Sequence, residues 1–283
     1  MVMIPIGFAA PAGLCALLVL ASVSPAGAQS SDALDRVAFL NEMAAEQAEV
    51  EVEAALATYE AALVVLENDP EPDDLAIAAQ LHLMGDYAAD KLWDYGDTRA
   101  IGYLSRAFGI RRAALGEDHL DVAATQFSLG KAFLLNGDAR TALRFLQEAL
   151  ETQEAGLPAD HVHIAHTLSW LASAHQSELQ LAEAEAFYQR SSAIFEAQLG
   201  AGSVDYGLDM MFLGEVYRDR GSAKEAEAAF SRARDALEPI AVDDEVHAAD
   251  LAYVLGELAA IYRSTGRTAR AEQYEARAAE LIE

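Results

Sequence analysis

Residues 121–156 read DVAATQFSLGKAFLLNGDARTALRFLQEALETQEAG, and this stretch decides the fold. Its apolar side chains recur three and four residues apart on both sides of an Asn-Gly pair, and this spacing places them on one face of a helix. Glycine tolerates left-handed backbone angles, so Gly137 suits a tight turn between two helices. The stretch therefore predicts a hairpin of two helices, over 121–135 and 139–154.

The same pattern recurs along the chain with a period of about forty-two residues. A large apolar residue followed by a small one marks each unit, at Leu129-Gly130, Leu171-Ala172, Leu213-Gly214 and Leu258-Ala259, with a weaker version at Ala88-Ala89. Small residues let two helices approach closely, and stacked hairpins can bury the apolar face that one hairpin alone cannot. The expected helix pairs are 74–92 with 98–114, 121–135 with 139–154, 162–177 with 181–198, 204–219 with 223–237, and 245–264 with 268–282.

This arrangement resembles tetratricopeptide repeats, and its period resembles the longer repeats of kinesin light chains. In those proteins a connector of the form Leu-Gly-x-x-His joins successive units. The chain has LGEDH at 115–119, keeps Leu and His in LPADH at 157–161, and keeps Leu-Gly in LGAGS at 199–203. The resemblance covers about residues 74–283. It implies an all-α fold, a right-handed α-solenoid of about five tetratricopeptide-like helical hairpins with an N-terminal acidic helix.

The first residues have the layout of a secretory signal peptide. Residues 4–23 are mostly apolar, Pro25 breaks the run, and Ala26-Gly27-Ala28 supplies small residues for cleavage before Gln29. No Lys or Arg precedes the apolar run, so an uncleaved membrane anchor stays open as an alternative. We expect a signal peptide over 1–28, an acidic helical cap or degenerate repeat over 29–73, and the repeat solenoid over 74–283. The protein is then periplasmic or secreted, without a membrane contact after cleavage.

Charge narrows the choice of partner. The chain has 46 acidic and 19 basic residues, a formal net charge of −27. Between Asp32 and Asp74 there are 13 acidic residues against one basic residue, Arg36. Such a surface repels nucleic-acid phosphates and anionic lipids, and it favours a basic protein partner. The only cysteine is Cys15, so a chain that begins at Gln29 has no disulfide and no cysteine nucleophile.

The sequence carries no recognisable catalytic motif. We find no Gly-rich phosphate loop, no Gly-x-Ser-x-Gly and no His-Glu-x-x-His. His161, His163 and His166 are close enough together to suggest a metal site, but His161 lies forty-two residues after His119 and so belongs to the repeat connector. We expect no catalytic residue, no metal and no cofactor. A metal-dependent enzyme built on the three histidines is a remote alternative.

The resemblance also implies where a partner binds. In tetratricopeptide proteins, peptide ligands lie along a groove lined by the first helix of each pair. The groove residues expected on this basis are Phe127, Lys131, Leu134, Ser169, Ser173, Gln176, Met211, Glu215 and Arg218. Kinesin light chains place ligand-clamping Asn side chains where this chain has Phe127, Ser169 and Met211, so side-chain pockets are expected to matter more than backbone hydrogen bonds.

The leading function is therefore an exported scaffold or adaptor that binds a protein or peptide partner in the concave groove. The alternative from another class is a structural envelope protein that self-associates, through its acidic N-terminal helix or its end repeats. Fold alone does not decide between them, because one fold hosts many functions.

Overall fold

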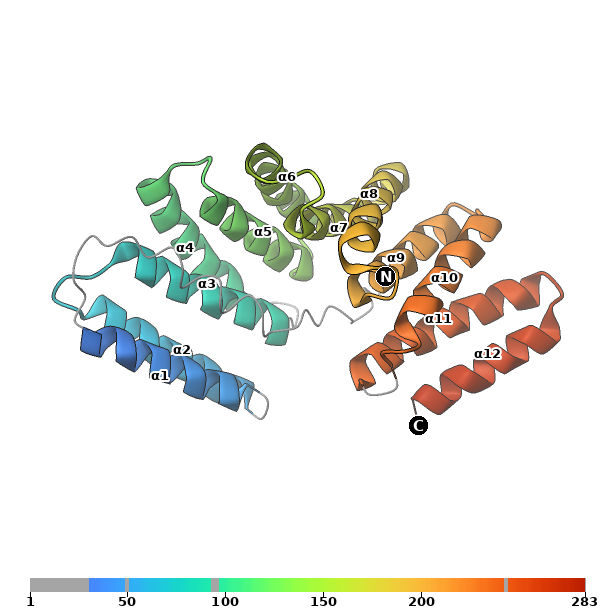
Figure 1. Cartoon of the computed structure of the whole chain (residues 1–283), viewed down its shortest axis with the longest axis horizontal. Coiled ribbons are helices and arrows are strands. Elements are labelled where there is room, and N and C mark those ends of the chain that lie inside the picture. Colours follow the sequence, from blue (N-terminus) through green and yellow to red (C-terminus); the bar gives the residue numbers. More distant parts are fainter. Residues whose placement is uncertain (1–30, 49–50, 93–96, 242–243, 283) are drawn as a thin grey trace. The chain divides into compact units, whose positions relative to one another are not determined.

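The computed structural model describes residues 31–48, 51–92, 97–241 and 244–282, and this part of the chain is built of α-helices joined by short turns (Figure 1). It divides into two compact units that meet in the sequence between Thr152 and Gln153. We call the described residues of 31–152 the N-terminal unit and those of 153–282 the C-terminal unit. The expected all-α fold of sequential helical hairpins is confirmed.

Successive helices run antiparallel within each unit. The N-terminal unit contains α1 (Ser31–Gln47), α2 (Val52–Glu67), α3 (Asp74–Lys91), α4 (Arg99–Leu115) and α5 (Leu120–Leu135), and α6 (Ala139–Gly156) crosses the boundary. The C-terminal unit contains α7 (Val162–Ser177), α8 (Leu181–Leu199), α9 (Val204–Asp219), α10 (Ala223–Leu237), α11 (Glu245–Ser264) and α12 (Thr268–Leu281). From α3 onward every bound lies within two residues of the predicted one. Among the described helices, none combines the length and the apolar character needed to span a membrane.

The acidic stretch before the repeats forms a hairpin, which fits the degenerate repeat of the two readings that the sequence left open. α1 ends at Gln47, and α2 begins at Val52 after Glu51 in extended backbone (φ −140°, ψ 96°). No Gly or Pro between Ser31 and Asp69 marks this break. The local signal is the run EVEVE at 49–53, because β-branched residues and closely spaced like charges both weaken a helix.

The two helices of a hairpin approach most closely at a small residue of the first helix. A Cβ added there would lie too close to the second helix: 2.4 Å from Leu104 Cγ at Gly85, 2.5 Å from Leu146 Cγ at Gly130, and 2.7 Å from the Phe230 ring at Gly214. The prediction that Ala88-Ala89 holds this place in α3 is wrong. The residue of closest approach in α3 is Gly85. The link from α3 to α4 (92–98) is longer than the link from α5 to α6 (136–138), so the contact with α4 falls earlier in α3.

The turns after α5, α7, α9 and α11 have the left-handed backbone that the sequence suggested, while the expected turn residue Gly96 lies outside the described residues. Gly137 has a φ of 83°, and the amide of Asp138 donates to the carbonyl of Phe133 at 2.9 Å, which closes the end of α5. Leu179 takes the same conformation after α7 with a φ of 59°, although a leucine pays more strain there than glycine. The turn is therefore imposed by hairpin packing even where its residue disfavours it.

From α3 onward, each odd-numbered helix also has a residue that faces the preceding hairpin. It lies five positions before the small residue of the helix. We call this the junction position. In four helices it is a polar side chain that is at most 4% exposed: Gln80, Thr125, Thr167 and Asp209. In α11 it is Val254, which is fully buried.

Every polar junction residue is hydrogen-bonded to the preceding hairpin. The bonds join Gln80 Nε2 to the Tyr59 carbonyl (3.1 Å), Arg111 Nη1 to Thr125 Oγ1 (2.7 Å), Thr167 Oγ1 to Gln153 Oε1 (2.7 Å) and Ser169 Oγ to Asp209 Oδ1 (2.6 Å). A buried polar group costs free energy unless it is paired, so within each unit these bonds favour one register between the helices that they join.

Replacing Gly130 by alanine tests the close approach. Alanine in a helix interior normally stabilises by about 1 kcal/mol relative to glycine. At Gly130 the added methyl meets Leu146 and the Ala142 carbonyl, and overpacking of this kind costs about 1–3 kcal/mol. We expect Gly130→Ala to lower the free energy of unfolding in urea.

The matched control is Gly102→Ala. Gly102 lies inside α4 with nothing within 4 Å of its added Cβ, so this variant should be as stable as the native chain or more so. Equal stabilisation by both substitutions would contradict the close approach.

Candidate functional site

The odd-numbered helices form one layer of each unit and bond to one another across hairpins. In the N-terminal unit, Asn41 of α1 and Gln80 of α3 exchange two hydrogen bonds, of 2.9 and 3.0 Å. In the C-terminal unit, Gln176 of α7 donates to Glu215 of α9 at 3.1 Å. The open face of this layer is the surface that corresponds to the predicted groove.

In the N-terminal unit this face carries a charged cluster on α3 and α5. His82 Nε2 lies 3.2 Å from Asp86 Oδ2, and the Lys131 ammonium pairs with the Asp90 carboxylate. Burial by itself would raise the pKa of Asp86, but His82 and Lys131 outweigh it and hold the pKa at about 2. Asp86 is therefore ionised at neutral pH, and half-buried Phe127 supplies the apolar part of the face.

In the C-terminal unit a chain of polar contacts joins three odd-numbered helices. Glu215 is 6% exposed, and its carboxylate accepts from Gln176 and from the Tyr253 hydroxyl of α11 at 2.6 Å. Burial raises the pKa of Glu215, while these two donors oppose the shift. Arg218 Nη1 lies 3.1 Å from Tyr253 Oη and 3.0 Å from Glu257 Oε2. With 40% of its side chain exposed, Arg218 is the part of this chain of contacts that a ligand can reach.

The predicted groove residues differ in accessibility. Leu134, Ser169 and Met211 are at most 3% exposed and pack inside their units, and Lys131 and Glu215 are 8% and 6% exposed and bonded to neighbouring helices. Phe127, Ser173 and Gln176 are half-buried, and Arg218 is exposed. A register position identifies the helix face, but it does not show how far a neighbouring helix covers that face. Partner binding at these positions stays a prediction, and it depends on the four accessible residues.

Asp209 is a buried acid that the sequence analysis did not single out. It is 2% exposed, its Oδ1 accepts from Ser169 at 2.6 Å, and its Oδ2 accepts from Ser191. Burial raises the pKa of this carboxyl to about 7, against the opposing effect of the two hydroxyls. The signal was available in the repeat register, because Asp209 occupies the position that Thr125 and Thr167 hold in the two preceding units.

The pH dependence of stability tests this environment. The folded chain keeps the Asp209 proton up to about pH 7, whereas an ordinary aspartate releases it near 3.8. The stabilising contribution is therefore present at low pH and lost as the pH rises through about 7. An amide stays neutral, so Asp209→Asn should match the native chain near pH 4 and exceed its free energy of unfolding at pH 8, by on the order of 2 kcal/mol.

The measurement is urea unfolding followed by circular dichroism from pH 4 to pH 8. The control is Asp205→Asn, which alters a carboxylate on the same helix that keeps 35% of its side chain exposed. A difference between Asp209→Asn and the native chain that does not change with pH would refute the raised pKa.

The histidine cluster has a structural explanation. The Nδ1 atoms of His119 and His161 each accept the amide of the residue two places on, at 3.1 Å, and so cap α5 and α7. The rings of His161 and His163 lie 4.8 Å apart, while His166 packs on Phe195 with 5.0 Å between ring centroids. Within the described part of the chain, no three His, Cys, Asp or Glu side chains are grouped so as to hold a metal ion.

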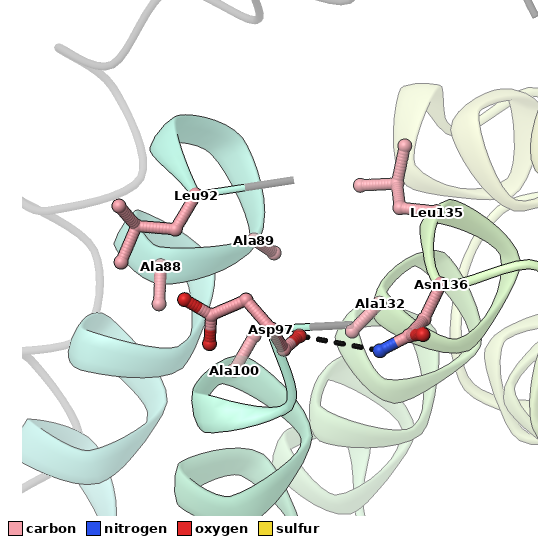
Figure 2. Close-up of a pocket in the computed structure, with 8 residues that line it drawn as sticks. All are labelled: Ala88, Ala89, Leu92, Asp97, Ala100, Ala132, Leu135 and Asn136. Carbon is pink, nitrogen blue, oxygen red and sulfur yellow. Dashed lines mark hydrogen bonds between the residues drawn. The ribbon is translucent and has the colours of Figure 1, made fainter. Parts of the chain in front are cut away.

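A small pocket lies in the N-terminal unit among α3, α4 and α5 (Figure 2). Its volume is about 10 Å³, which is room for about one water. Asn136 Nδ2 donates across it to the carbonyl of Asp97 at 3.2 Å. The residues around it are Ala88, Ala89, Leu92, Asp97, Ala100, Ala132, Leu135 and Asn136. This pocket is too small for an organic substrate.

Comparison with known proteins supports the same conclusion about the fold. A family model described as tetratricopeptide repeat matches residues 96–155 and 163–238. No curated protein sequence matches the chain significantly.

Three solved structures illustrate the likeness. BtubC (BKLC) from P. vanneervenii aligns with a TM-score of 0.63 at 19% identity, over 88% of this chain and 90% of that one. A putative kinesin light chain from Podosopora anserina with nearly identical TPR-like repeats aligns with a TM-score of 0.57 at 20% identity, over 70% and 92%. A Rap protein complexed with competence and sporulation factor aligns with a TM-score of 0.61 at 17% identity, over 87% and 74%. At these identities the likeness is one of fold.

Proposed function

Because the chain is a tetratricopeptide-type repeat protein, we propose that it is an exported scaffold, without enzymatic activity, that binds a protein or peptide partner on the face of its odd-numbered helices. The observation that carries this proposal is the accessible polar row of the C-terminal unit, formed by Ser173, Gln176 and Arg218. These side chains come from consecutive odd-numbered helices and offer a hydroxyl, an amide and a guanidinium to one ligand.

The row suits an extended peptide. Gln176 and Arg218 are held by Glu215, Tyr253 and Glu257, so little side-chain entropy is lost when a ligand binds. The Rap protein of the same fold was crystallised in a complex with a separate factor, which supports ligand binding by stacked hairpins of this kind. The net charge of −27 makes a partner with basic residues the favoured one, because opposite charge speeds encounter and deters acidic competitors.

Site-directed cross-linking tests the location. A chain that begins at Gln29 has no cysteine, so single cysteines can carry a photoactivatable maleimide. We expect Ser173→Cys on α7 to capture a partner from cell-envelope extract, because this side chain belongs to the proposed binding row. Mass spectrometry of the adduct identifies the partner and the segment that was captured.

Ser231→Cys on α10 is the matched control, because Ser231 is half-buried like Ser173 but lies on an even-numbered helix. Capture by Ser231→Cys alone, or equally by both variants, would contradict binding on the odd-numbered face. If neither variant captures a partner and light scattering shows a stable oligomer, self-association replaces this proposal.

Export is tested by the N-terminus of the protein. When the full chain is expressed in a bacterium with a periplasm, we expect intact-mass analysis to find a periplasmic protein that begins at Gln29. Ala28→Leu should block cleavage, because the −1 position needs a small residue, whereas Ala16→Leu lies in the apolar run and should leave cleavage unchanged. A cytoplasmic protein that retains Met1 would refute export.

A further inference from the structure

The first hairpin leaves its junction position open. Ala44 is the fully buried small residue of α1, so the junction position five residues ahead of it is Phe39. Asn41, two residues after Phe39, bonds to Gln80 of the next hairpin as Ser169, two residues after Thr167, bonds to Asp209. The register of α1 therefore matches that of α7.

Exposure sets Phe39 apart from its counterparts. The side chains at the junction positions of α3, α5, α7, α9 and α11 are between 0 and 4% exposed, because the preceding hairpin covers them. Phe39 is 62% exposed, while Val37 and Ala44 on the opposite side of α1 face the core. A residue type that favours burial thus lies on a face that elsewhere in this chain always receives helices.

The outer surface of α12 is polar and contrasts with that of α1 at Phe39. Of the residues of α12 only Ala271 is buried, and its exposed side chains include Arg270, Glu272, Gln273, Glu275 and Glu280. A polar outer surface is what an end repeat needs for solubility. α1 departs from this pattern at Phe39, where a cap would be expected to carry a polar residue.

We propose that the Phe39 face of α1 is a docking surface for a basic amphipathic helix of a partner protein. Asp35, Arg36 and Leu40 lie beside Phe39 on α1 and form an open surface with it. Half-buried Met43, one helical turn beyond Phe39, extends the apolar surface along the helix. A row of apolar residues at this spacing is what an incoming helix buries when it packs by its own apolar face.

Charge selects a basic helix. Asp35, Glu42 and Glu46 are exposed on α1 around the apolar row. The stretch from Asp32 to Asp74 contains 13 acidic residues and one basic residue, Arg36. Lys and Arg side chains flanking an apolar stripe complement this rim. A second copy of the same hairpin would set like charges against each other, so the acidic rim disfavours self-association through α1.

The test is a fluorescence-anisotropy titration of the chain from Gln29, which contains all the described helices. The probe is a labelled eighteen-residue helix of leucines at helical spacing with lysines elsewhere. Removing a large buried apolar side chain from an interface weakens binding by about tenfold or more, so we expect that loss for Phe39→Ser. A probe with glutamate in place of lysine should not bind.

Val64→Ser is the control, since Val64 is a 52% exposed apolar residue of α2 in the same acidic hairpin. It should bind the lysine probe like the native chain, and circular dichroism should show equal helix content in all three proteins. Equal losses for Phe39→Ser and Val64→Ser, or equal binding of the glutamate probe, would overturn the proposal. A native dimer that Phe39→Ser converts to a monomer would assign the face to a second copy instead. Cross-linking from Ser173→Cys does not involve α1, so either proposal can fail alone.

Discussion

The close approach of the two helices in each hairpin is the constraint on which the rest of the structure depends. At Gly85, Gly130 and Gly214 the first helix has no room for a side chain, because a residue of the second helix already fills that space. Interiors are packed too densely to absorb even a methyl group at such a point. The small residue thereby fixes how the hairpin is paired, and the positions of all other side chains relative to the next hairpin follow from it.

The hairpins are then joined by buried hydrogen bonds as well as by apolar contact. Arg111 and Gln153 occupy equivalent places forty-two residues apart and reach the threonines of the following hairpin. In the next repeat the equivalent residue is Phe195, whose side chain can neither donate nor accept a hydrogen bond, and Asp209 accepts from Ser169 and Ser191 instead. The ionisable residue Asp209 thus lies at the junction where Phe195 replaces the polar residue of the earlier repeats.

Much of this architecture could be predicted from the sequence. Period, small residues and turn glycines were enough to place ten helices to within two residues, because each signal recurs and the copies support one another. The place of the break between α1 and α2 was not predicted, and the register of α3 was wrong. The first lacks Gly or Pro, and the second is displaced by a longer link, so neither is repeated elsewhere in the chain. The candidate site was harder still: Met211 and Arg218 lie on one helix, yet their exposure depends on neighbouring helices that no local pattern describes.

The junction bonds have a consequence for folding. A chain of similar hairpins can pair a helix with the wrong neighbour while it folds, and repeat proteins misassemble in this way. Here the partners differ among the four polar junctions, as a carbonyl, a guanidinium, an amide or a pair of hydroxyls, and the fifth junction has the apolar Val254. A hairpin packed out of order would bury at least one of these groups against a surface that does not match it. The repeats are therefore similar in shape but not interchangeable, because the buried group at the junction differs from one repeat to the next.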